Sequence, residues 1–105
     1  MHIEQIDDVA GTSLKGRIAS TYYDLVDALG EPITEGLDGS TVEWRVEIED
    51  DYDTLHTVCV YDRHQDYTPK GQYDWYVGAH NLEGCDALSD YLTQVQALAN
   101  WNRVS

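Results

Sequence analysis

Hydrophobic and polar residues alternate most clearly over residues 41–49, near the middle of the chain. Every second residue there is apolar: Val42, Trp44, Val46 and Ile48. A period of two residues is typical of a strand with one buried face. Three aspartates and a tyrosine at residues 50–53 favour a turn, which predicts a β-hairpin with residues 55–61 as its second strand. Two sets of residues compete for the inward face of that strand: Val58 and Val60, or Leu55, Cys59 and Tyr61.

Two other segments carry hydrophobic residues at spacings of three and four, which predicts amphipathic helices. The first helix follows the capping candidates Ser20 and Thr21 and ends at Gly30. Its apolar residues are Tyr22, Leu25, Val26 and Leu29. The second helix begins between Asn81 and Asp86. Its apolar stripe comprises Leu88, Tyr91, Leu92, Val95 and Leu98, with Trp101 as a candidate continuation.

Two shorter stretches complete the predicted sheet. Residues 14–18 and 73–77 favour strands, the latter with Trp75 facing inward. Residues 1–13 mix acids with small residues without a sustained period, so we expect a loose N-terminal arm. Residues 14–105 then form one α+β domain in the order β-α-β-β-β-α. We expect a small antiparallel sheet of about four strands with both helices packed on one face.

The length of 105 residues suits a single domain, but the charge of the chain is far from balanced. Twenty aspartates and glutamates against six lysines and arginines give a formal net charge of −14 at pH 7. Such a field repels nucleic acids and anionic membranes and favours basic partners or cations. No apolar run approaches the roughly 18 residues that a membrane helix needs, and the N-terminal residues lack the order of a secretory signal. We therefore expect a cytoplasmic protein that contacts neither nucleic acid nor membrane directly.

Short motifs distributed over residues 14–80 resemble those of a known group of proteins. They are Leu14-Lys15-Gly16, Thr21-Tyr22, Leu25-Val26, Gly30-Glu31-Pro32, Val42-Glu43-Trp44, Val60-Tyr61-Asp62, Thr68-Pro69 and Tyr73-Asp74-Trp75-Tyr76-Val77-Gly78. In these motifs the chain resembles a group of small, uncharacterised acidic proteins encoded by bacteriophages and related mobile elements. It departs from that group at Ala79-His80, where a second small residue and then an apolar one are expected. The resemblance brings no catalytic residues, and it implies an accessory protein that acts in the cytoplasm of an infected bacterial cell.

Two cysteines and two histidines are the candidates for metal binding or thiol chemistry, spaced as Cys59-x4-His64 and His80-x4-Cys85. Four such ligands form a tetrahedral zinc site if the two segments meet, although structural zinc sites usually pair ligands at shorter spacing. Cys85 in the first turn of a helix, with His80 as its base, is a second arrangement. Buried thiols and surface histidines are the simpler interpretation. We therefore predict no metal, no cofactor and no catalytic residue.

Acidic residues on the exposed face of the predicted hairpin are the strongest functional signal. Three glutamates share the strand with Arg45, and three aspartates continue into the turn. Alternate strand residues lie about 6.6 Å apart, so the carboxylates form a row on the scale of nucleic-acid phosphates. This row predicts a non-enzymatic, DNA-mimic-like protein that inhibits or modulates a basic host protein, such as a defence nuclease, a restriction factor or a CRISPR effector. The predicted contact residues are Glu43, Glu47, Glu49, Asp50, Asp51 and Asp53, with a second patch at Asp24 and Asp27.

Two other classes of function stay open at this point. A small metal-binding or thiol-dependent protein would be built around the two cysteines and two histidines. A self-associating structural phage protein would use exposed aromatic residues, and the oligomeric state is open. The candidates are Tyr23, Tyr52, Tyr67 and Tyr76. Metal analysis tests the first class and light scattering tests the second.

Overall fold

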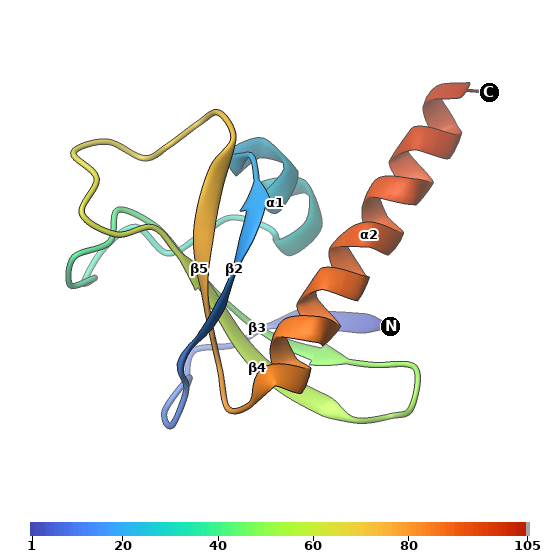
Figure 1. The fold of residues 1–105 in the computed structure, drawn as a ribbon, viewed down its shortest axis with the longest axis horizontal. Coiled ribbons are helices and arrows are strands. Elements are labelled where there is room, and N and C mark those ends of the chain that lie inside the picture. The colour runs from blue at the N-terminus through green and yellow to red at the C-terminus, as the bar shows by residue number, and fades with distance from the viewer. Residues whose placement is uncertain (105) are drawn as a thin grey trace.

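Two helices pack on one face of a five-stranded antiparallel sheet in the computed structural model, which describes residues 1–104 (Figure 1). Side chains are described for residues 1–96. The elements are β1 (His2–Gln5), β2 (Ser13–Ser20), α1 (Tyr22–Leu29), β3 (Glu43–Glu49), β4 (Leu55–Tyr61), β5 (Tyr73–Ala79) and α2 (Leu82–Val104). Across the sheet the strand order is β1-β3-β4-β5-β2, and every neighbouring pair is antiparallel. The predicted α+β class, antiparallel sheet and two helices are confirmed.

Strand β1 changes the predicted strand count and order. It lies inside the segment expected to be a loose arm, and it pairs with β3 from His2 opposite Glu49 to Gln5 opposite Val46. The sheet therefore has five strands rather than about four, and the element order is β-β-α-β-β-β-α. A four-residue strand with Ile3 as its inward apolar residue is too short to show a period of two in the sequence.

The hairpin of β3 and β4 resolves which face of each strand is buried. Val46 lies opposite Val58, and Trp44 lies opposite Val60, so both valines of β4 face the core. Cys59 points to the other side of the sheet and is nevertheless only 5% exposed. The two predicted inward tryptophans, Trp44 and Trp75, are 1% and 0% exposed, which confirms that prediction.

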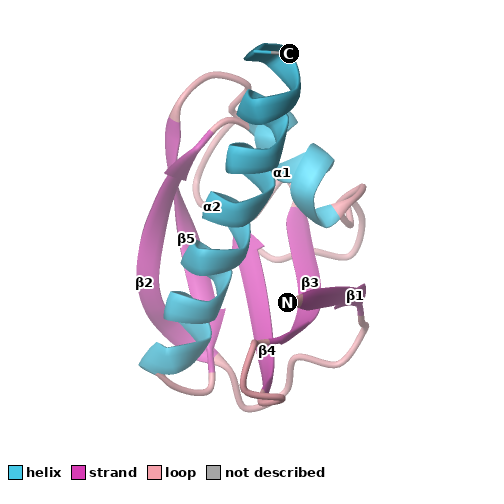
Figure 2. Cartoon of the chain, turned by 90° about the vertical axis from the view of Figure 1, so that its right-hand side faces the viewer, coloured by secondary structure: helices cyan, strands magenta, loops and turns pink. Residues whose placement is uncertain are grey.

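The helices cover the face of the sheet that carries Trp44, Trp75 and the two valines of β4, and both helices lie in front of the sheet in Figure 2. Thr21 caps α1 by accepting a hydrogen bond from the backbone N–H of Asp24, and Gly30 ends the helix at φ +90°. The hydroxyl of Tyr91 in α2 donates to the backbone oxygen of Ala28 in α1. The predicted stripe residues Leu98 and Trp101 lie outside the part of α2 whose side chains are described. Within the described chain, neither helix is long and apolar enough to cross a membrane.

Residues 6–12, which we call the strap, connect the two edge strands of the sheet. The strap runs from β1 on one edge to β2 on the other, and its contacts lie on the face opposite the helices. The backbone oxygen of Asp7 accepts a hydrogen bond from Arg45 on β3, and the Thr12 hydroxyl lies 3.9 Å from the Cys59 sulfur on β4. The strap therefore buries Cys59 and divides this outer face into two parts.

Candidate functional site

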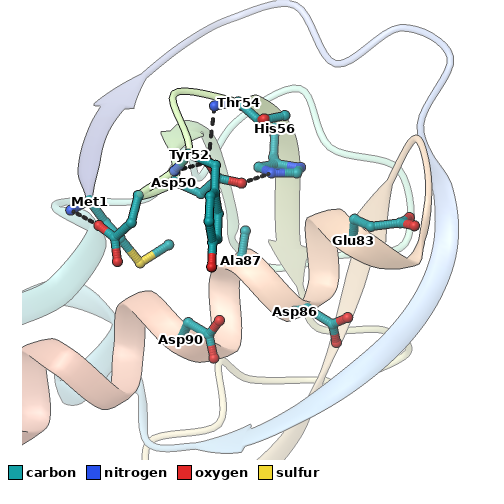
Figure 3. Close-up of a pocket in the computed structure, with 10 residues that line it drawn as sticks. Met1, Asp50, Tyr52, Thr54, His56, Glu83, Asp86, Ala87 and Asp90 are labelled. Atoms are coloured by element: carbon teal, nitrogen blue, oxygen red, sulfur yellow. Dashed lines mark hydrogen bonds and ion pairs between the residues drawn. The ribbon is translucent and has the colours of Figure 1, made fainter.

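A groove of about 320 Å³ lies between the β3–β4 turn and the first turns of α2 (Figure 3). Its lining residues are Met1, Asp50, Asp51, Tyr52, Thr54, His56, Glu83, Asp86, Ala87 and Asp90. Five of them carry carboxylates, and none is a lysine or arginine. The groove therefore presents a concentrated negative charge to any molecule that enters it.

Asp50 organises the turn that forms one wall of the groove. One of its carboxylate oxygens accepts hydrogen bonds from the backbone N–H groups of Tyr52 and Thr54, both at 2.9 Å. The other oxygen lies 2.9 Å from Nε2 of His56, the second residue of β4. Asp53 takes the left-handed conformation at φ +61°, which aspartate tolerates better than most residues. The aspartate-rich composition of this turn thus has a structural role as well as an electrostatic one.

These contacts make the turn sensitive to acid. The hydrogen bond from His56, followed by those from the backbone of Thr54 and Tyr52, lowers the pKa of Asp50 below its ordinary value. The stabilisation is therefore fully present above the ordinary aspartate pKa of about 3.9 and is lost as the pH falls through the lowered pKa. We expect the Thr54 amide resonance to shift within that acidic window in an NMR titration. In Asp50→Asn the shift in that window should disappear, and a shift that persists would contradict this assignment.

Helix α2 supplies the opposite wall of the groove. Glu83, Asp86 and Asp90 are spaced at three and four residues, so they share one face of the helix. Asn81 precedes the helix, and its side-chain oxygen accepts a hydrogen bond from the backbone N–H of Gly84. The ring of Tyr52, which is 89% exposed, extends from the turn toward Ala87 and Asp90 (Figure 3). The Tyr52 ring therefore extends to the helix that carries these three carboxylates.

The three predicted glutamates of β3 lie on the outer face, but they do not form one uninterrupted row. Glu43 is bound to the guanidinium of Arg45 and lies at the far end of β3 from the turn. Glu47 lies beside Glu4 of β1 in the register, so β1 adds a carboxylate that the sequence interpretation missed. Glu49 is the last residue of β3 and leads into the turn. The negative charge is therefore concentrated at the turn end of the strand.

The remaining predicted residues fall into two groups. Asp51 and Asp53 lie in the turn with Asp50. The carboxylate of Asp51 forms an ion pair with the amino group of Met1, which donates a hydrogen bond to it at 3.0 Å. Asp24 and Asp27 are exposed on α1, which follows β2 at the opposite end of the sheet. The structure therefore separates the second predicted patch from the hairpin.

We call the carboxylates gathered around the hairpin turn the acidic end. They come from β1, β3, the turn and α2. The members are Glu4, Glu47, Glu49, Asp50, Asp51, Asp53, Glu83, Asp86 and Asp90. The α2 members were detectable in the sequence from their helical spacing, but only the tertiary fold places that helix face beside the turn.

The cysteines and histidines considered for metal or thiol chemistry do not gather. Cys59 lies under the strap on the outer face, whereas Cys85 belongs to α2 on the helix-covered face and lies close to Gly16. His64 follows the end of β4 and His80 follows the end of the antiparallel β5, so the two lie at opposite ends of the sheet. Among the described residues, no group of three or more acidic, histidine or cysteine side chains is arranged to hold a metal ion.

Neither thiol has the lowered pKa that is typical of a reactive cysteine. Burial raises the pKa of the Cys59 thiol. Burial, and then the neighbouring carboxylate of Asp86, raises the pKa of the Cys85 thiol. The position of Cys85 in the first turn of α2 therefore does not produce the lowered pKa that a reactive thiol needs.

Comparison with protein-family models, with curated proteins and with solved structures finds no match to this chain.

Proposed function

We propose that this protein is a non-enzymatic binding protein whose acidic end docks on a basic surface of a partner protein. The observation that carries the proposal is that β1, β3, the hairpin turn and α2 bring nine carboxylates to the turn end of the sheet. Five of them line a groove whose lining contains no lysine or arginine. Clustered like charges repel each other and stabilise a fold little. An arrangement of this kind is therefore better explained by attraction to a positively charged partner.

The partner class follows from the density of the charge. Proteins that bind nucleic acid use lysine and arginine surfaces that select closely spaced negative charges. The acidic end offers such charges on a rigid scaffold: Glu47 and Glu49 project from a central strand, and three carboxylates project from one helix face. A protein surface of this kind competes with nucleic acid for the same basic groove. Electrostatic steering would make its association fast and sensitive to salt.

The biological setting of the proposal comes from the resemblance to phage-encoded accessory proteins. It places the partner in the cytoplasm of an infected bacterial cell, where nucleic-acid-binding defence enzymes such as restriction or CRISPR nucleases act on phage DNA. In this setting the protein would inhibit or modulate such an enzyme by occupying the groove that holds its nucleic acid.

Removing the charges of α2 tests the proposal directly. The triple variant Glu83→Gln, Asp86→Asn and Asp90→Asn keeps the side-chain shapes and removes three negative charges. We expect its association with the partner to slow by about tenfold or more, with a shallower salt dependence. Affinity capture from host lysate with the unchanged protein and the variant as paired baits, followed by kinetic measurement on the purified partner, provides the readout.

Two further variants show whether the effect belongs to the acidic end. The first removes three charges of the acidic end from the outer face by replacing Glu4, Glu47 and Glu49 with glutamine, and it should also slow association. The matched control removes three exposed charges elsewhere: Asp24→Asn, Asp27→Asn and Glu35→Gln. Equal weakening by the control would mean that only net charge matters. A partner that stays bound in the presence of excess duplex DNA would argue against competition for a nucleic-acid groove.

A further inference from the structure

A row of arginine and tyrosine side chains crosses the outer face of the sheet on the other side of the strap. Arg17 of β2 lies opposite Tyr76 of β5, and Tyr76 lies opposite Tyr61 of β4, so the three occupy neighbouring positions on one face. Arg63 follows β4 and lies near the Tyr61 ring. We call these four residues the Arg–Tyr row.

The side chains of the Arg–Tyr row stack on one another. The rings of Tyr61 and Tyr76 are nearly parallel, at 16°, with their centroids 5.8 Å apart. The guanidinium of Arg17 lies 4.6 Å from the centroid of the Tyr76 ring and donates a hydrogen bond to the Tyr76 hydroxyl at 3.3 Å. The guanidinium of Arg63 lies 5.9 Å from the centroid of the Tyr61 ring. Stacking of this kind holds the side chains in place before any partner binds.

Among the described side chains, the two arginines of this row have no carboxylate partner, although the chain contains twenty aspartates and glutamates. Of the lysines and arginines in residues 1–96, only Arg45 has a carboxylate within 4.0 Å, that of Glu43. Arg17 and Arg63 are both exposed. Their remaining guanidinium N–H groups are therefore free to bind an acidic group from another molecule.

We infer that the Arg–Tyr row is a second docking surface, and that it binds a carboxylate-bearing segment of a partner protein. The planar guanidinium group matches the geometry of a carboxylate, and the neighbouring tyrosine hydroxyl adds a hydrogen-bond donor. Arginine and tyrosine are also, with tryptophan, the residues enriched in the energetic centres of protein interfaces. The exposed carboxylate of Asp74, two residues before Tyr76 on the same strand, favours a short segment with few charges.

Single-stranded nucleic acid fits this surface less well. Bases bind proteins by stacking on free aromatic faces, but in this row Tyr76 has Tyr61 and Arg17 against its ring. The net charge of −14 also opposes a polyanion more strongly than a short peptide with a few carboxylates. The inference rests on the proposed function in one respect only: it assigns the acidic end and the Arg–Tyr row to the same partner. A partner with basic and acidic groups at matching positions would then dock in a single orientation.

A fluorescently labelled hexapeptide of alternating aspartate and glycine, with an amidated C-terminus, is the probe for this surface. At an ionic strength of about 0.15 M, where the Debye length of about 8 Å screens the distant carboxylates, fluorescence anisotropy should show saturable binding. Arg17→Gln and Arg63→Gln should each weaken it by about tenfold, as expected for the loss of a charged hydrogen-bonding partner. Lys70→Gln is the matched control, because it removes one positive charge at Tyr22, away from the row, and it should leave binding unchanged.

Four results would overturn the inference. Absence of binding, or equal weakening by Lys70→Gln, would leave no specific surface. Tighter binding of a labelled single-stranded oligonucleotide than of the peptide would identify nucleic acid as the ligand. Self-association in sedimentation that Arg17→Gln abolishes would identify a second copy as the occupant.

A further variant separates this test from that of the proposed function. The α2 triple variant at Glu83, Asp86 and Asp90 should keep or strengthen peptide binding, because it removes repulsive charge. If peptide binding depends on those carboxylates, the Arg–Tyr row is not its site. Circular dichroism of each arginine variant confirms that it is folded, and the two arginines lie on separate segments, so each serves as the check on the other.

Discussion

Replacement of Trp75 by alanine is expected to lower the free energy of unfolding by about 3–5 kcal/mol, the range for removing a large aromatic residue from a packed core. The side chain is fully buried, and its ring packs edge-on against Trp44 and Tyr73 at centroid distances of 5.3 and 5.0 Å. Its indole N–H donates to the backbone oxygen of Ser20 at 2.9 Å, which ties β5 to the end of β2. The loss is large beside the total stability of a small domain, about 5–15 kcal/mol.

Urea unfolding followed by circular dichroism measures this change. Tyr67→Ala is the matched control, because the Tyr67 side chain is 86% exposed and its removal should shift the midpoint little. Equal midpoints for the Trp75 variant and the unchanged protein would mean that β5 does not present this face to the helices.

Replacement of Asp62 by alanine is expected to cause the second largest loss of stability, after the replacement of Trp75. The Asp62 carboxylate is completely buried, and one oxygen accepts hydrogen bonds from the backbone N–H groups of Thr41 and Val42 at 2.8 and 3.2 Å. The other oxygen accepts the Thr41 hydroxyl, which in turn accepts the hydroxyl of Thr68. Alanine leaves the buried Val42 N–H without an acceptor, which costs about 1–3 kcal/mol, and the part-buried Thr41 N–H adds about 1 kcal/mol. The expected loss is therefore about 2–4 kcal/mol.

Asp62→Asn separates this network from a simple effect of charge. The asparagine oxygen can still accept the two backbone N–H groups, so its loss of stability should be less than half that of alanine. Hydrogen exchange of the Thr41 and Val42 amides should accelerate in the alanine variant and much less in the asparagine variant. Equal loss of stability in both variants would show that the negative charge, rather than the acceptor geometry, holds the segment of Thr41 and Val42 against Asp62.

The parts of the fold that were predictable from sequence are those with a local physical cause. The alternation of β3 determines its buried face without reference to the rest of the chain, because side chains on a strand alternate by geometry. The α1 boundaries follow from Thr21 as the cap and Gly30 as the terminating residue. Neither needs a distant partner to be recognised.

Strand β1 and the inward face of β4 lacked such a local signal. β1 becomes a strand only because β3 offers an unpaired edge, and its four residues are too few to show a period. On β4 the valines and Cys59 are all buried, since the helices cover one face and the strap covers the other at this point. A strand covered on both faces cannot show alternation of polar and apolar residues.

For the candidate site, the sequence by itself determined the abundance of negative charge and placed three glutamates and three aspartates on one hairpin. The tertiary structure alone decided which carboxylates lie together, because bringing Glu83, Asp86 and Asp90 beside the turn requires α2 to pack along the sheet. It also decided that Arg45 binds Glu43 and that Arg17 and Arg63 stack on two tyrosines without a carboxylate. Sequence spacing determines neighbours within one helix or strand, whereas contacts between elements depend on the register and packing of the whole sheet.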